Sequence, residues 1–468
     1  MGVVAGLMVG AIGICHADSP VVVELSPQAP GAPIAGDFVG LSFEMQRVLP
    51  DTNGAHFFSP SNRPLIATFK TLGIKNLRVG GNTADRPTLP TPDTAAVDSL
   101  FAFAKAADVK VIYTLRLHEG NRGEAVTMAD YITRHYARQL DCFAIGNEPN
   151  VFSKEYAPYL AEWKRYAAQI TAPTNSPGAA FCGPSTSPGH ETWSRDFANE
   201  FGHRGPLALI AQHDYPGGDA RKVTDPAAAR DKILSAAMDE HYAKFAAHFI
   251  PAVVSNGLPC RLEEANSFYD GGAPEVSDTF AAALWALNYQ WWWAAHSVSG
   301  INFHTGDKVA ARDENKPCRY AVFWTATNGY DVHPLGYALK MFSLGSRGRL
   351  LSATVQNGEG LNLAVYAAAI DEKHLCLTLI NREHGPGARA AEITIAPGWL
   401  GARAEMIALV APNGDVAAKN GVTLGGAEIR DDAIWKGRWT PLAKPAADGK
   451  FSVRLHAASA ALVKITAK

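Results

Sequence analysis

The chain has 468 residues, of which 47% are hydrophobic and 19% are charged. This composition is typical of a globular protein and excludes a disordered one, and the length suits a barrel joined to a smaller domain. The net charge of −2 argues against a general nucleic-acid-binding protein, because such proteins need a strong positive field.

The N-terminal segment has the outline of a secretory signal. An apolar and glycine-rich run covers residues 3–15, and Ala17 offers a small residue for cleavage before Asp18. The run is too short to span a membrane, so we expect residues 1–17 to be a signal peptide. No Lys or Arg precedes the run, which leaves a frayed apolar tail as the alternative. We therefore expect a secreted or periplasmic protein with no membrane segment in its mature form.

The cysteines indicate neither a disulfide framework nor a zinc site. Cleavage of the signal would leave five, at widely scattered positions and without a CxxC spacing. We expect most of them to be buried free thiols, although Cys142 and Cys182 could pair across neighbouring strands. The sequence also lacks a metal-ligand cluster, and the Gly80-Gly81 pair is weak evidence for a phosphate site, so we expect no metal and no cofactor.

Strand and helix signals alternate along residues 36–347. Helices are expected near 62–73, 95–107 and 154–171. The eight expected strands lie at 38–44, 76–81 and 109–115, within 141–150, at 180–184 and 207–213, within 260–267, and at 300–304. This alternation predicts a closed (β/α)8 barrel, also called a TIM barrel.

The pattern changes on either side of residue 348. The connection from Thr305 to about Pro334 is long for a βα loop, so we expect a lid or binding loop, or small structure of its own. Short alternating runs between turns then predict an antiparallel β-sandwich over residues 348–468. A strand at 21–26 has no barrel helix after it, so residues 18–35 are expected to join this sandwich as a strand and a link.

Two glutamates end the fourth and seventh barrel strands, Glu148 and Glu264. The carboxyl ends of barrel strands carry the catalytic residues of such folds. Alternation of side chains puts Glu148 on the inward face with Cys142 and Ala144, and it puts Glu264 inward and Glu263 outward. Two facing carboxyl groups form the acid/base and nucleophile of a retaining glycosidase.

At these positions the chain resembles glycoside hydrolase family 79 of clan A, the β-glucuronidases and heparanases. The matching segments are 40–44, 77–82, 144–150 and 264–274, followed by 277–280. The resemblance covers nearly the whole chain after the signal. It implies a retaining hydrolase of β-glucuronosyl linkages in uronic-acid-containing glycans such as heparan-type glycosaminoglycans, acting in endo or exo fashion. Glu148 would be the general acid/base and Glu264 the nucleophile.

The resemblance also implies a set of substrate-binding residues. Tyr269 and Gly271 occupy the places of a phenol and a backbone N–H that hold the sugar carboxylate, which is sound chemistry for an anion. Glu44 and Asn82 match positions that address sugar hydroxyls, and Asn147 can do the same beside the acid. His213 and Tyr215 end the strand next to the nucleophile. Ordinary packing roles for Tyr269 and His213 are the alternatives.

One position departs from the family pattern. The family uses a tyrosine in the loop after the eighth strand, and here none precedes Tyr320. Either Tyr320 fills that place, or Lys308 or Arg312 meets the sugar acid, or the substrate differs.

Further basic residues, Arg116, His118 and Arg122, follow the third strand. Together with Lys308 and Arg312 they could form a rim that binds a sulfated or uronic-acid polymer, or they could be solvated loop charges. Two other functions stay open: another clan A glycosidase with a neutral-sugar specificity, and a secreted, catalytically inactive glycan-binding protein. The sequence leaves the oligomeric state and the choice between endo and exo action undetermined.

Overall fold

The computed structural model describes residues 20–202, 205–309 and 313–468. The expected signal peptide at residues 1–17 lies outside this part of the chain. Within the described ranges, none of the helices combines the length and the apolar character that crossing a membrane would need.

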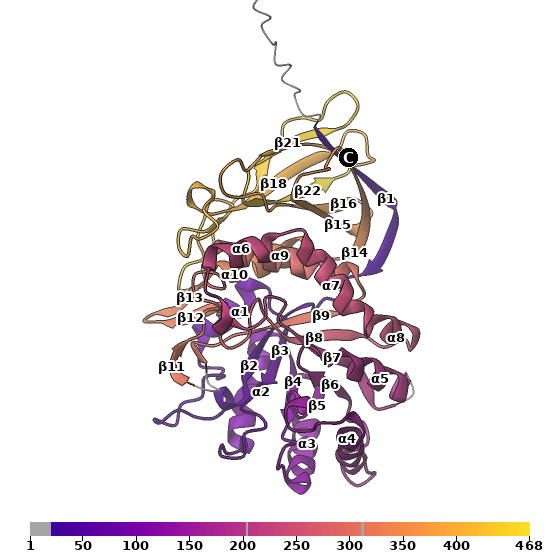
Figure 1. Ribbon diagram of the computed structural model, residues 1–468, viewed down its shortest axis with the longest axis vertical. Helices are drawn as coiled ribbons and strands as arrows, with labels where there is room; N and C mark the ends of the chain where they lie inside the picture. The colour runs from indigo at the N-terminus through magenta and orange to yellow at the C-terminus, as the bar shows by residue number, and fades with distance from the viewer. Residues whose placement is uncertain (1–19, 203–204, 310–312) are drawn as a thin grey trace, which may run out of the picture.

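Eight parallel strands form a closed barrel in which the last strand pairs with the first (Figure 1). Their order around the barrel is the chain order, so the predicted TIM barrel is confirmed. The fourth strand ends at Ile145, which places Glu148 in the turn after the strand. The strands are β2 (Val39–Glu44), β3 (Asn76–Gly80), β4 (Lys110–Leu115), β5 (Leu140–Ile145), β6 (Phe181–Thr186), β7 (Leu207–Asp214), β8 (Cys260–Ala265) and β9 (Gly300–His304).

Helices cover the outside of the barrel, and local signals set their ends. Asp93 Oδ1 accepts a hydrogen bond from Ala96 N and so caps the second helix. Gly73 ends the first helix in the left-handed region, at φ 79°, which turns the chain into β3. The helices are α1 (Arg63–Leu72), α2 (Thr94–Ala107), α3 (Arg122–Tyr136), α4 (Tyr156–Ile170), α5 (Glu191–Phe201), α6 (Pro226–Leu234), α7 (Ala237–Ala247) and α8 (Ile250–Ser255).

The inward face of β5 carries small side chains, as predicted. Cys142 and Ala144 belong to an apolar cluster inside the barrel, whereas Phe143 and Ile145 pack in the outer cluster with the helices. The five cysteines of the described ranges are free and buried, including Cys142 and Cys182.

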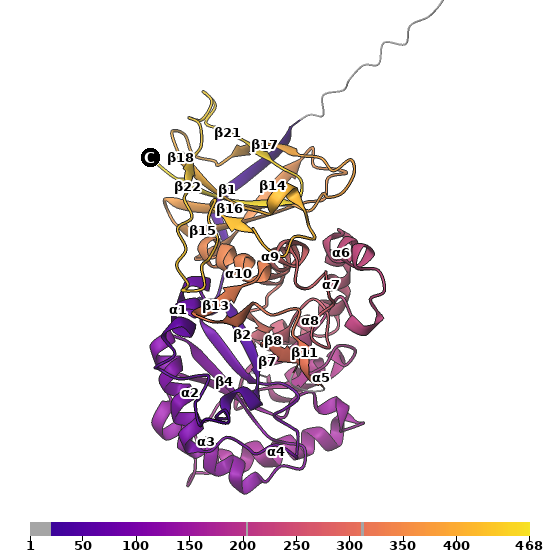
Figure 2. The same cartoon turned by 90° about the vertical axis from the view of Figure 1, so that its left-hand side faces the viewer.

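Two further helices, α9 (Phe280–Ala295) and α10 (Pro334–Gly345), lie between the barrel and the C-terminal sheet (Figures 1 and 2). Nearly every residue of α9 is buried, because the helix is covered by the barrel on one side and by the sheet on the other. Trp291 stacks on Tyr366 of the sheet at a centroid distance of 5.8 Å.

The C-terminal domain is a curled sheet of ten strands with an apolar core of its own, which agrees with the predicted β-sandwich. The N-terminal strand β1 lies within it, antiparallel to β14 and parallel to β17, and the other pairs are antiparallel. The strands are β1 (Val21–Pro33), β14 (Arg349–Gln356), β15 (Leu363–Asp371), β16 (His374–Asn381), β17 (Ala391–Ala396), β18 (Arg403–Val410), β19 (Thr423–Leu424), β20 (Thr440–Pro441), β21 (Phe451–Leu455) and β22 (Ser459–Thr466).

The long connection after β9 carries small structure of its own, the second of the two alternatives. Strands β10 (Lys308–Val309) and β11 (Asp313–Pro317) form one antiparallel pair. Strands β12 (Phe323–Ala326) and β13 (Gly329–Val332) form a hairpin before α10.

Candidate active site

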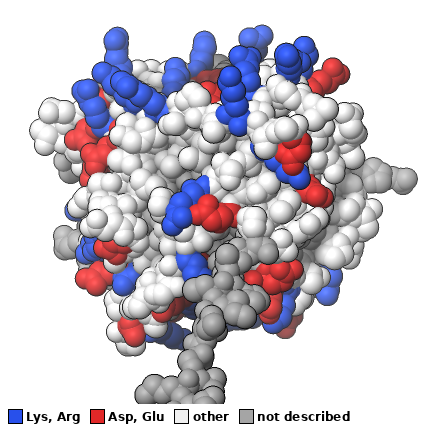
Figure 3. Space-filling view, turned by 90° about the horizontal axis from the view of Figure 1, so that it is seen from above, with Lys and Arg blue, Asp and Glu red and all other residues white. Residues whose placement is uncertain are grey.

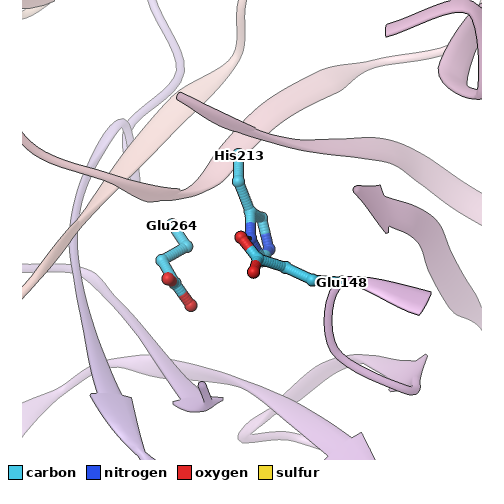
Figure 4. Close-up of side chains that lie close together, drawn as sticks. All are labelled: Glu148, His213 and Glu264. Carbon is cyan, nitrogen blue, oxygen red and sulfur yellow. Dashed lines mark hydrogen bonds and ion pairs between the residues drawn. The ribbon is translucent and has the colours of Figure 1, made fainter. Parts of the chain in front are cut away.

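Glu148 and Glu264 face each other at the carboxyl end of the barrel (Figure 4). One carboxylate oxygen of each lies within 4.8 Å of the other and of a ring nitrogen of His213. Glu148 adopts a left-handed conformation, at φ 45°, and its N–H donates to Ser185 O at 2.9 Å. This turn, followed by the short 3-10 helix Pro149–Val151, aims the Glu148 side chain across the mouth.

Strand β8 departs from the predicted alternation. Leu262 packs in the outer cluster, whereas Glu263 lies near Cys182 and therefore faces the barrel interior, so its predicted outward position is wrong. A β-bulge is the reason: Gln212 pairs with Leu262, but the next residue, His213, pairs with Glu264. The extra residue lets both glutamates point inward.

Glu264 is held by two buried donors. Arg78 Nη1 donates to Glu264 Oε2 at 2.5 Å, and the Tyr215 hydroxyl donates to Glu264 Oε1 at 2.9 Å. Burial alone would raise the pKa of Glu264, but the charges of His304, His213 and Arg78 outweigh it and hold the pKa well below its ordinary value. Glu264 is therefore an ionised carboxylate.

Arg78 connects the two sides of the site, and sequence reasoning gave it no role. Besides Glu264, its guanidinium donates to Ser42 Oγ at 3.1 Å and to Asn147 Oδ1 at 2.6 Å. A Cβ at Gly80 would meet the Arg78 guanidinium carbon at 2.4 Å, so the absence of a side chain at this glycine makes room for the guanidinium group. One sequence signal could have pointed to Arg78: it is a charged residue flanked by apolar residues in a buried strand, and a buried charge needs a partner.

Asn147 is fixed on two sides. Its N–H donates to Asp85 Oδ2 at 2.6 Å, while its side-chain oxygen accepts from Arg78. Asp85 also accepts from the N–H groups of Leu117 and His118, and burial raises its pKa. This arrangement leaves the Asn147 NH2 group as the donor that can reach a substrate hydroxyl.

His213 lies between two carboxylates. Its Nδ1 is 3.0 Å from Glu148 Oε1 and its Nε2 is 3.5 Å from Glu263 Oε1. Burial alone would lower the pKa of His213, but the nearby carboxylates outweigh it and raise the pKa to about 9. The ring is thus an imidazolium at neutral pH.

Glu44 lies at the mouth of the barrel, at the end of β2. Its carboxylate accepts hydrogen bonds from the N–H and hydroxyl of Thr83 at 2.8 and 2.6 Å, and it lies 3.6 Å from His304 Nε2. A Cβ at Gly81, whose φ is 66°, would meet the Glu44 carboxylate at 2.4 Å. The Gly80-Gly81 pair is therefore explained by close contacts with Arg78 and Glu44.

The residues predicted to hold a sugar carboxylate lie beside Tyr215, which donates to Glu264. Tyr269 is 38% exposed, and its ring meets Tyr215 edge-on at 6.3 Å. Gly271 O accepts from the N–H groups of Arg319 and Tyr320, which joins this segment to the loop after β9. Tyr320 is buried, with its ring 6.2 Å from Tyr215. Tyr320, one of the replacements considered for the family tyrosine, therefore lies in this cluster.

The remaining predicted residues are less closely tied to the two glutamates by contacts in the described part of the chain. Asn82 is exposed at the end of β3, and no contact places it against the catalytic pair within the described ranges. Lys308 is exposed at the edge of the mouth. Arg312 lies outside the described residues.

The basic residues after β4 are largely engaged by the protein. Arg116 donates to two backbone carbonyls of the segment 84–89, at 2.9 Å each. His118 stacks on Phe152 at 4.5 Å, and Arg122 lies 3.6 Å from a glutamate of α4. These contacts favour a structural role over a free rim for an anionic polymer.

A pocket of about 560 Å³ adjoins the site on the Glu44 side. Its lining includes Glu44, Arg47, Phe57, Asp307 and Lys308. Arg47 pairs with Asp307 at 2.7 Å and lies over the Phe57 ring at 3.9 Å. Paired charges beside an aromatic ring suit the hydroxyls and apolar face of a sugar.

Glu148, His213 and Glu264 are also spaced closely enough to hold a metal ion. Each already has a protein partner, and the positive charge of Arg78 already compensates that of Glu264. The donor set therefore fits an acid/base pair better than a metal site.

No protein-family model matches the chain. A β-glucuronidase of Aspergillus niger is 24% identical over 339 residues, which are 60% of this chain and 60% of that protein. A β-glucuronidase of Neurospora crassa is 27% identical over 106 residues, or 21% of this chain and 18% of that protein. The chain thus matches about 60% of the length of the first relative and far less of the second.

Solved structures of glycoside hydrolases share the fold. A 4-O-α-L-rhamnosyl-β-D-glucuronidase of Fusarium oxysporum, in a Rha-GlcA complex, has a TM-score of 0.71 at 18% identity, over 94% of this chain and 99% of that one. A GH51 arabinofuranosidase of Xanthomonas axonopodis pv. citri has a TM-score of 0.68 at 16% identity, over 96% and 100%. At such identities the likeness establishes the architecture, a TIM barrel with a sheet domain.

Proposed function

We propose that this protein is a retaining glycoside hydrolase that cleaves β-glucuronosyl linkages in uronic-acid-containing glycans, similar to family 79. The observation that carries the proposal is the pair Glu148 and Glu264, with carboxylate oxygens within 4.8 Å at the barrel mouth. Retaining enzymes hold their two carboxyl groups about 5–5.5 Å apart, whereas inverting enzymes leave room for a water between them.

The two carboxylates have different surroundings, which suits two different roles. Glu264 is bound by Arg78 and Tyr215 and is ionised, as a nucleophile must be. Glu148 is partly open to solvent, with 16% of its side chain exposed, and its partner is the ring of His213. A group that exchanges protons with substrate and water needs such access.

The reaction then proceeds in two displacements. Glu264 attacks the anomeric carbon while Glu148 gives its proton to the leaving oxygen, and a glycosyl ester forms on Glu264. Glu148 next takes a proton from water as the water oxygen attacks the anomeric carbon and releases Glu264. The β configuration is retained.

Preference for a uronic acid is supported by the groups beside the nucleophile. The phenols of Tyr269 and Tyr320 and the N–H of Gly271 can donate hydrogen bonds to a sugar carboxylate. Within the described chain, no acceptor is found for the Gly271 N–H. The fungal β-glucuronidases among the sequence relatives support the same sugar.

Nitrophenyl β-D-glucuronide tests the proposal directly. We expect turnover by the wild type, β-glucuronic acid as the first product in proton NMR, and loss of turnover by at least ~1000-fold in Glu264→Gln, because nucleophile removal abolishes the covalent step. Glu275→Gln, an exposed acid after the same strand, is the matched control. An α product would exclude a retaining mechanism, and full activity of Glu264→Gln would exclude the assignment.

The alternatives have their own readouts. A neutral-sugar enzyme would hydrolyse nitrophenyl β-xyloside or α-arabinofuranoside better than the glucuronide. An inactive glycan-binding protein would hydrolyse none of these. Digestion of heparan sulfate and hyaluronan separates endo action, which yields oligosaccharides, from exo action, which yields single uronic acids. We propose export of the protein by residues 1–17, which would bring it to such glycans.

A further inference from the structure

Glu263 is a second glutamate inside the barrel, one residue before the proposed nucleophile. Its side chain is fully buried, so it cannot touch a substrate at the mouth. Burial of a carboxylate is unfavourable unless other groups compensate its charge. The neighbours of Glu263 should therefore explain why the barrel holds it.

The partners of Glu263 are a histidine and a thiol. Its Oε1 lies 3.5 Å from His213 Nε2, and its Oε2 accepts from Cys182 Sγ at 3.5 Å. Burial alone would raise the pKa of Glu263, but the charge of Arg78 and the contact with His213 hold the pKa below its ordinary value. Glu263 is thus an ionised carboxylate directed at the back of the His213 ring.

The front of the same ring meets Glu148. His213 is fully buried on β7, and its Nδ1 lies 3.0 Å from Glu148 Oε1. The Nε2 of the ring lies at ion-pair distance from Glu263, and the other ring nitrogen, Nδ1, is the one hydrogen-bonded to the proposed acid/base. The titratable or charged groups that face His213, Glu148 and Glu263 include Arg78 from β3, Cys142 from β5, Tyr159 from α4, Cys182 from β6, Tyr215 after β7 and Glu264 from β8.

We propose that Glu263 is a positioning residue that orients the His213 ring. The oriented ring in turn keeps the proton that is destined for the leaving group at Glu148. The inference rests on the proposed function, because it gives Glu148 the acid/base role. In the first step this proton moves to the glycosidic oxygen as its bond to the anomeric carbon breaks. In the second step a water proton returns to Glu148 as the water oxygen bonds to that carbon and the ester bond from the carbon to Glu264 breaks.

Glu263→Gln tests the inference, since it keeps the shape and removes the charge. Without that charge His213 holds its proton less tightly, so the basic limb of the pH profile of kcat/KM should move to lower pH by about one unit. For phenyl β-glucuronide, whose leaving group needs a proton, kcat/KM should fall by about 10–100-fold. For the dinitrophenyl analogue, whose leaving group departs unaided, the loss should stay under about 3-fold.

Two variants serve as controls. Glu263→Asp retains the charge and should restore the position of the basic limb. Cys182→Ala removes the other partner of Glu263 without touching His213 and should leave the limb in place. Equal losses on both substrates with an unmoved basic limb would assign Glu263 a merely structural role and overturn the inference.

A spectroscopic readout covers the case in which Glu263→Gln does not fold. NMR spectra of wild-type protein labelled with nitrogen-15 histidine should show both ring nitrogens of His213 protonated at neutral pH. The His213 signals are assigned by their loss in the His213→Gln spectrum. A neutral His213 would overturn the inference. Lack of wild-type activity on any aryl glucuronide would instead contradict the proposed function, while the ring spectrum would still test the Glu263–His213 contact.

Discussion

Arg78 shows how one buried charge can organise a site. Its planar guanidinium presents two arms in a fixed fork, one to Glu264 and one to Asn147. A lysine has a single ammonium group and cannot bridge both partners. Removal of one member of a buried ion pair costs about 3–5 kcal/mol, because the other charge stays buried without compensation.

We therefore expect Arg78→Lys to lower kcat/KM for nitrophenyl β-glucuronide by at least ~100-fold, since a displacement of about 1 Å at reacting groups has that effect. Arg165→Lys is the matched control, because its exposed pair with Glu162 should contribute under about 1 kcal/mol. Kinetics combined with urea unfolding separates lost positioning from lost stability. Wild-type kcat/KM in Arg78→Lys would show that the bridge is not needed.

Sequence reasoning could predict the residues that end strands. Four residues of the site end or follow barrel strands: Glu44, Glu148, Tyr215 and Glu264. The carboxyl ends of all barrel strands lie at the same end of a TIM barrel, so these residues are expected there together. Arg78 could not be assigned its partner, because Glu264 lies 186 residues away along the chain. Only the closed barrel brings them together.

At the scale of elements, β5 and β8 differ in how far alternation predicts them. The faces of β5 are as expected, with Cys142 inside and Phe143 outside. In β8 the bulge opposite His213 inverts the prediction for Glu263. A bulge depends on the pairing with the neighbouring strand, which the residues of β8 alone do not specify.

The segment after β9 contributes to the pocket beside Glu44. The hydrophobic pattern of the sequence predicted no strands there. The strands of the two pairs, β10 with β11 and β12 with β13, are too short to produce a recognisable alternation. Glu44 ends β2, three strands around the barrel from β5, which precedes Glu148. If Glu148 is the acid/base, as proposed, it faces the leaving group, and we then expect the pocket past Glu44 to lie toward the non-reducing end of the substrate.

We expect this pocket to bind a second sugar on that side. Arg47→Met keeps the stem over Phe57 but removes the charge that pairs with Asp307. It should raise KM about 10-fold for an aryl glucuronide that carries a neutral hexose at its non-reducing end, which corresponds to about 1.4 kcal/mol of lost binding. The simple aryl glucuronide is the internal control, and its KM should not change. Equal effects on both substrates would place Arg47 in the catalytic site instead.

At the scale of the whole molecule, one apolar cluster runs from the barrel into the sheet domain, which also has a second cluster of its own. Trp291 and Phe342 from the intervening helices belong to the same apolar cluster as Ala364 and Leu462 of the sheet. The N-terminal strand β1 pairs inside the C-terminal sheet, so both ends of the chain are needed to complete it. These contacts favour a single cooperative unit.

Charge is unevenly distributed over this unit. Viewed from the sheet-domain end, Lys and Arg side chains gather along one edge, whereas the rest of that face is mixed or uncharged (Figure 3). The net charge of −2 therefore conceals a local positive edge. A positive edge of this kind attracts anions mainly through long-range, salt-sensitive electrostatics.

Trp291 tests whether barrel and sheet unfold together. Its ring is fully buried, stacks on Tyr366 and packs against Phe342 at 5.0 Å. Trp291→Ala should lower the free energy of unfolding by about 3–5 kcal/mol, through lost burial and the cavity left between the layers. Because the cluster spans both layers, the urea midpoints from near-UV circular dichroism and from residual activity should fall together.

The control for that experiment is Leu400→Ala, whose side chain is 81% exposed on the sheet domain. It should change the free energy of unfolding by no more than about 0.5 kcal/mol. If Trp291→Ala instead lowers the midpoint for one probe only, the transition has two parts. The barrel would then be stable without the sheet, and the shared core would not be what couples them.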